Sequence, residues 1–106
     1  MVHLKNDLLD YEIVLPKTIE KYLFKLYKKD RKTFIGIDKT LIEIATRPQD
    51  YSMLQGKFIG CRKARKSNYR ILFEINELEK KVIIVRIGKR SNIYKFLSLF
   101  EINTII

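Results

Sequence analysis

The chain has 106 residues, of which 46% are hydrophobic, and this length predicts one domain with a single core. Lys and Arg number 22 against 12 Asp and Glu, for a net charge of +10. This charge favours a polyanionic partner, namely nucleic acid, an acidic protein or a membrane surface. A solvated basic surface without such a partner would show the same charge. The single cysteine, Cys61, excludes an internal disulfide framework, and no apolar run reaches the roughly 18–20 residues of a membrane span, so we expect a cytoplasmic protein without membrane segments.

The first half of the chain predicts one short strand and two helices. Residues 11–15, YEIVL, alternate weakly as in a strand, and Pro16 suits the first turn of a helix. Residues 17–29 and 33–47 each carry an apolar face with helical spacing, and Pro48 should end the second helix. These two faces consist of Ile19, Leu23, Leu26 and Tyr27, and of Phe34, Ile37, Leu41 and Ile44. The polar link DRK, residues 30–32, joins the two helices into a hairpin.

The second half predicts three strands after a loop at residues 48–56. The strands are expected at about 57–65, 68–77 and 81–88, with NELEK (76–80) as a hairpin turn, and residues 91–100 as an optional short helix. The order β-α-α-β-β-β predicts an α+β domain, in which a helical hairpin packs on one face of a mostly antiparallel, twisted sheet. Residues 1–10 precede this core as an extension whose role the sequence does not indicate.

Basic side chains of the predicted strands should gather on the face of the sheet that the helices leave open. In residues 69–75 the apolar side chains alternate with Arg70, and in residues 81–90 the wholly apolar positions 83, 85 and 87 are the better core face. The open face would then carry Lys63, Arg65, Arg70, Arg86 and Arg90, with Glu74 as an acid that could pair with Arg70 or Arg86.

This convergence of charge indicates an anion-binding surface. Each basic residue taken singly is explained by solvent on a half-exposed sheet. Like charges on neighbouring strands are destabilising, however, so a cluster of them is typical of a place that an anion will occupy.

Three segments resemble the RelE/ParE superfamily of type II toxins, and specifically the RelE branch of messenger-RNA-cleaving toxins. They are LQG (54–56), CRKARKSNYRILFEI (61–75) and RIGKRSNIY (86–94), and the order of elements fits over about 11–97. The resemblance implies a single RelE-like toxin domain that cleaves mRNA in the ribosomal A site without a cofactor. Its implied partners are mRNA, the ribosome and a cognate acidic antitoxin.

The resemblance also implies roles for individual residues. Arg70, Arg90, Tyr94 and Lys63 match catalytic positions of the family, whereas Cys61 stands where relatives carry a second lysine. That departure leaves the general base open, and the neighbouring cations would bind RNA phosphates; these are Lys57, Arg62, Arg65 and Arg86.

The chemistry of RNA cleavage fits these residue types. The 2′-OH of RNA is the nucleophile, so the protein has to stabilise phosphorane charge and move protons. Arginine stays charged and suits the first task, whereas lysine and tyrosine suit the second where cations lower their pKa. Tyr94 could instead stack on a base. His3 is the only histidine and the acids lack metal-loop spacing, so we expect no metal.

Two alternatives remain open. A ParE-like toxin would inhibit DNA gyrase without cleaving nucleic acid, and an inactive relative would only bind nucleic acid.

The apolar stretch IYKFLSLF (93–100) either packs back on the domain or lies where an antitoxin can displace it.

Overall fold

The structure, a computed structural model, describes residues 2–4, 10–54 and 60–93. Lys57 and Tyr94 of the predicted site lie outside the described residues, as does most of the predicted C-terminal helix. Residues 90–93, at the start of that segment, are helical.

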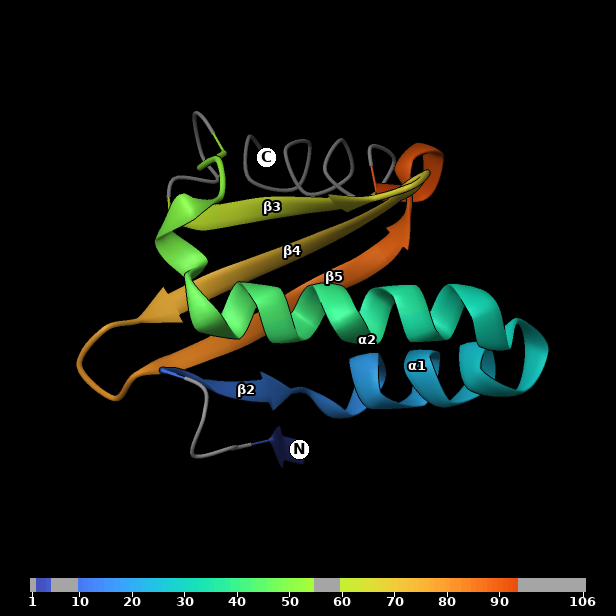
Figure 1. The fold of residues 1–106 in the computed structure, drawn as a ribbon, viewed down its shortest axis with the longest axis horizontal. Helices are drawn as coiled ribbons and strands as arrows, with labels where there is room; N and C mark the ends of the chain where they lie inside the picture. The colour runs from blue at the N-terminus through green and yellow to red at the C-terminus, as the bar shows by residue number, and fades with distance from the viewer. Residues whose placement is uncertain (1, 5–9, 55–59, 94–106) are drawn as a thin grey trace, which may run out of the picture.

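Two helices cover one face of a five-stranded sheet, which confirms the α+β class (Figure 1). The strand order is β1-β2-β5-β4-β3, and all neighbours are antiparallel except β2 and β5, which are parallel. The elements are β1 (Val2–Leu4), β2 (Glu12–Leu15), α1 (Lys17–Lys29), α2 (Arg31–Thr46), the 3-10 turn η1 (Pro48–Asp50), β3 (Cys61–Lys66), β4 (Tyr69–Asn76) and β5 (Lys81–Lys89).

The strand β1 was not expected from the sequence. It pairs with β2, with Val2 opposite Leu15, so the extension at residues 1–10 adds a strand at the edge of the sheet. The strand predicted at about 57–65 is β3, which is described from Cys61 onward; residues 57–59 of that prediction lie outside the described residues. Gly60 precedes it in a turn with a φ of +102°, a conformation that favours glycine.

The helical hairpin is confirmed, with a tighter connection than predicted. Asp30 alone separates α1 from α2, and its carboxylate caps α2 by accepting hydrogen bonds from the Thr33 backbone N–H (3.1 Å) and hydroxyl (2.6 Å). Ile19, Leu23 and Leu26 are buried as expected, but Tyr27 is 40% exposed and does not belong to the core.

The predicted core face of β5 was wrong in its first half. Val82 and Ile84 are fully buried against the helices, whereas Ile83 and Val85 are only half-buried. A β-bulge is the cause: Leu72 pairs with Arg86 but Phe73 pairs with Ile84, which leaves Val85 as an extra residue. Ile87 therefore returns to the core face, and Arg86 keeps its place on the opposite one.

Within the described ranges, neither helix combines the length and the apolar composition needed to cross a membrane.

Candidate nucleic-acid interface

Three strands bring basic side chains to the face of the sheet opposite the helices. Arg65 pairs directly with Arg70, Lys63 pairs with Leu72, and Leu72 pairs with Arg86. Cross-strand partners point to the same face, and Ile71 and Phe73 on the other parity are fully buried in the helix-covered core. The predicted convergence of Lys63, Arg65, Arg70 and Arg86 on one face is therefore confirmed, and we call these four residues the cationic face.

Two backbone hydrogen bonds hold the side chain of Arg70 on the cationic face. Its Nη1 donates to the backbone oxygens of Ser67 (3.1 Å) and Tyr69 (2.9 Å) at the β3–β4 turn. Ser67 has a φ of +52°, which lets two residues close the turn. In the described part of the chain, both hydrogen bonds of this side chain are made by Nη1. Its charge also lies directly across from that of Arg65.

Arg90 joins the same end of the sheet through its backbone. Its N–H donates to the Asn68 oxygen at 2.7 Å, and Gly88, two residues earlier, pairs with Arg70. The β3–β4 turn and the orange-red helical turn at residues 90–93 lie together in Figure 1. Arg65, Arg70 and Arg90 thus meet around one turn.

Arg86 lies apart from this group, although it belongs to the same face by register. It is exposed and lines a small hollow with Tyr22, Ile19 and Asn92, beside α1. Burial and the neighbouring Tyr69 hydroxyl raise the pKa of Tyr22, while the charge of Arg86 acts in the opposite direction. Arg86 is therefore the member of the cationic face that lies nearest to α1.

Cys61 occupies the position where relatives are expected to carry a lysine. Its thiol donates to Glu74 Oε1 at 3.6 Å, and burial, together with the Glu74 charge, raises the pKa of Cys61 to about 11. The thiol is therefore protonated near neutral pH and supplies neither a cation nor a base. Glu74, which was expected to pair with Arg70 or Arg86, accepts this hydrogen bond from the thiol.

The structure does not bring Arg62 to the cationic face. Arg62 has the other parity of β3, and its Nη1 donates to the backbone oxygens of Gln49 (3.2 Å) and Tyr51 (2.7 Å). The guanidinium thereby links the η1 turn to the sheet, so the position of Arg62 is explained by a structural role without RNA binding. Strand register alone would have separated Arg62 from Lys63 and Arg65.

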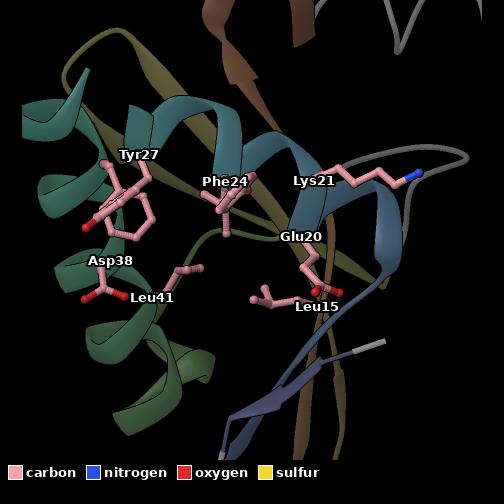
Figure 2. A pocket seen from close by; sticks show the side chains of 9 residues that line it. Leu15, Glu20, Lys21, Phe24, Tyr27, Asp38 and Leu41 are labelled. Atoms are coloured by element: carbon pink, nitrogen blue, oxygen red, sulfur yellow. The ribbon is translucent and has the colours of Figure 1, made fainter. Parts of the chain in front are cut away.

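An apolar groove between α1 and α2 is a second feature, and sequence reasoning missed it (Figure 2). It has a volume of about 440 Å³ and reaches the end of β2 at Leu15. Phe24 is 59% exposed in it, and Tyr27 packs edge-on against Phe34 with 5.2 Å between ring centroids. The available signal was Phe24, an aromatic residue off the apolar stripe of α1 and flanked by lysines.

Among the described residues, no three His, Cys, Asp or Glu side chains gather in a way that could hold a metal ion. The side chain of His3 lies outside the described part.

Comparison with known proteins decides the family. Residues 13–94 match the family described as the ParE toxin of the type II toxin–antitoxin system parDE. The chain belongs to this family. The resemblance to the RelE/ParE superfamily is thereby confirmed, and the chain is a toxin of a type II toxin–antitoxin system.

Relatives of this toxin include a protein of Methanocaldococcus jannaschii with the provisional name toxin RelE4. The two are 32% identical over 92 residues, which cover 86% of this chain and 98% of the relative. Two solved structures share the fold. The RelBE2 toxin–antitoxin complex of Mycobacterium tuberculosis has a TM-score of 0.67 at 20% identity, covering 80% of this toxin and 97% of that chain. A double-arginine mutant of Escherichia coli toxin RelE in the free state has a TM-score of 0.59 at 21% identity, covering 82% and 92%.

Proposed function

We propose that this toxin is a ribosome-dependent mRNA endonuclease that uses the RNA 2′-OH as its nucleophile and needs no metal. The observation that carries the proposal is the direct cross-strand pair of Arg65 and Arg70, with Arg90 at the same turn. Such a pair of like charges costs free energy in the isolated protein, and a bound phosphate offsets that cost.

Each basic group has a distinct task in this mechanism. Arg70 is held in place by the turn carbonyls, so its charge is positioned to stabilise the negative charge that develops on the scissile phosphate. Arg65 and Arg90 bind the phosphate backbone on either side. Lys63 lies two residues before Arg65 on the same face of β3 and is the candidate for proton transfer. The family resemblance makes Tyr94 a second candidate for proton transfer. Cys61 is excluded as the base by its raised pKa.

The experiment is to incubate the toxin with purified ribosomes that carry a defined mRNA and to determine the chemistry of the product ends. We expect a 2′,3′-cyclic phosphate and a 5′-OH, with little cleavage of the same mRNA off the ribosome. A 3′-OH with a 5′-phosphate would contradict attack by the 2′-OH. No cleavage by the wild type under any condition would remove the proposed activity.

We propose that the partner of the apolar groove is an amphipathic helix of an acidic antitoxin. The groove has an apolar floor with exposed Phe24, and Glu20 and Asp38 also line it. Exposed Lys17, Lys21 and Lys28 follow the outer side of α1. A helix whose apolar stripe meets the floor and whose acidic side meets these lysines complements both features.

Binding measurements with variants test this surface. Phe24→Ala should weaken binding of the cognate antitoxin at least tenfold, because exposed aromatic anchors commonly contribute about 2 kcal/mol or more. Ile42→Ala is the matched control, since Ile42 is 46% exposed on α2 but does not line the groove. Equal effects of both variants would place the antitoxin elsewhere.

Inhibition of DNA gyrase is the second candidate function, because the matched family is that of the ParE toxin. A supercoiling assay with purified gyrase tests it. Inhibition without RNA cleavage would favour this candidate over the endonuclease.

A further inference from the structure

A second basic site lies on the helix-covered side of the β3–β4 turn. It is a hollow of about 390 Å³ between the first half of α2 and the turn, and its polar lining includes Lys32, Thr33, Lys39, Lys66, Ser67 and Asn68. We call this cavity the lysine hollow, after Lys32, Lys39 and Lys66 in its lining. Neither the family resemblance nor the cationic face accounts for it.

The local sequence explains how three lysines reach one place. Lys32, Gly36 and Lys39 are spaced i, i+4, i+7 and share one face of α2, with about 10 Å along the axis between the two lysines. Gly36 has no side chain, and a Cβ there would lie 2.8 Å from Lys66 Cε. The aliphatic part of the Lys66 side chain therefore lies against α2 at Gly36, between Lys32 and Lys39.

Among the described residues, no acidic side chain lines this hollow. The nearby carboxylate of Asp30 is committed to the cap of α2; its hydrogen bonds to Thr33 lower its pKa, and Lys32 and Lys89 contribute to that lowering. Three lysine side chains thus line one hollow, and the described part of its lining offers no compensating charge. Such an arrangement is stabilised by an anion from outside.

The hollow and the cationic face adjoin the same turn from opposite sides of the sheet. Lys66 and Arg65 are consecutive in β3, so their side chains point to opposite faces of the sheet. Ser67 and Asn68 line the hollow, while the Ser67 and Asn68 carbonyls hold Arg70 and Arg90 on the other side. The turn is therefore a ridge with cations on both flanks.

We propose that the lysine hollow binds the phosphate backbone of structured RNA beside the mRNA strand on the cationic face. Lysine meets phosphate as a point charge and does not read bases, so the contact is sequence-independent. The toxin's larger apolar groove for a protein segment lies elsewhere, between α1 and α2, which favours RNA over an acidic polypeptide here. The inference rests on the proposed function for its partner, and adds a docking contact separate from the site of cleavage.

The test compares two variants that each lose three positive charges. One is Lys32→Gln/Lys39→Gln/Lys66→Gln. The matched control is Lys25→Gln/Lys29→Gln/Arg47→Gln, whose three residues are exposed and lie outside both the groove and the hollow. Fluorescence anisotropy with a labelled A-form RNA duplex, repeated over a salt series, gives the slope of log K against log salt. We expect the hollow variant to lose about 2–3 from the magnitude of this slope, since each phosphate contact contributes about 0.9, and the control to lose less than about 1.

A third variant tests geometry without a change in charge. Gly36→Ala pushes the Lys66 stem aside and should reduce the slope by about 1 while the melting temperature is kept or raised. Thermal melting of all variants confirms that each is folded. Equal losses in the hollow and control variants would reduce the effect to net charge and overturn the proposal. A wild-type slope in the hollow variant, or no duplex binding by the wild type, would also overturn it.

Two further arms separate this proposal from its alternatives. If the hollow variant keeps RNA binding but loses binding to polyglutamate, the partner is an acidic protein and the RNA assignment fails. If the wild type does not cut mRNA on ribosomes but duplex binding depends on the hollow, the proposed endonuclease fails and the hollow stands. If the wild type cuts mRNA on ribosomes but duplex binding does not depend on the hollow, the proposed endonuclease stands and the proposed role of the hollow fails.

Discussion

Replacement of Arg70 by alanine should separate catalysis from folding. The side chain is half-buried at the sheet surface, where an effective dielectric constant of about 20 is appropriate. A guanidinium charge about 4 Å from a phosphate charge then contributes about 4 kcal/mol. Loss of one preorganised donor commonly costs about 10²–10³ in rate, which is of the same size. We therefore expect cleavage on ribosomes to fall by about 10²–10³.

The same substitution should change stability little. It removes the Nη1 hydrogen bonds to the Ser67 and Tyr69 carbonyls, which together contribute about 1 kcal/mol at a site that water can reach. It also removes the repulsion from Arg65 across the strand pair, which costs up to about 1 kcal/mol. These effects oppose each other, so the free energy of unfolding should change by less than about 1 kcal/mol.

The assay is single-turnover cleavage of ribosome-bound mRNA, with urea unfolding of the same preparations. Lys25→Ala, which removes an exposed charge from α1, is the control and should cleave at the wild-type rate. Wild-type cleavage by Arg70→Ala would place the chemistry elsewhere. A loss of activity that matches a loss of folded protein would show that the role of Arg70 is structural.

Three more results are expected. Arg62→Ala should lower the free energy of unfolding by about 1 kcal/mol, because two backbone carbonyls lose their donor and no facing like charge is relieved. It should retain cleavage per folded molecule, and reduced cleavage by fully folded protein would return Arg62 to the RNA site. The rate of Cys61 alkylation by iodoacetamide should still rise with each step from pH 8 to pH 10, because its pKa is about 11, and a plateau by pH 9 would contradict this. Hydrogen bonds from Gln49 and Tyr11 lower the pKa of Glu77, so its ionised form stabilises the fold above the ordinary carboxyl pKa of about 4.3. Glu77→Gln should therefore lower the melting temperature at pH 7, and the difference should vanish as the pH falls through the lowered pKa; an equal difference at pH 7 and pH 2.5 would refute the linkage.

The candidate site was predictable to the extent that it depends on strand alternation. Arg65 and Arg70 were expected on one face because the period of two is local, and the register confirmed them as direct partners. Arg62 was grouped with them because it is basic and close in sequence. Its bonds to the Gln49 and Tyr51 carbonyls depend on where the η1 turn docks, and no local pattern specifies that.

The same distinction applies to the fold. The sequence by itself determined the two helices, the β3–β4–β5 meander and the excess of positive charge, because apolar period, turn residues and composition act over a few neighbouring residues. Only the tertiary structure decided the bulge at Val85, the strand β1 and the close approach of Lys66 to Gly36. These features arise where segments distant in the chain pack together, and the free energy that selects them is that of the assembled core and sheet. For this toxin, tertiary packing therefore places the lysine hollow beside a turn whose cations the sequence already contains.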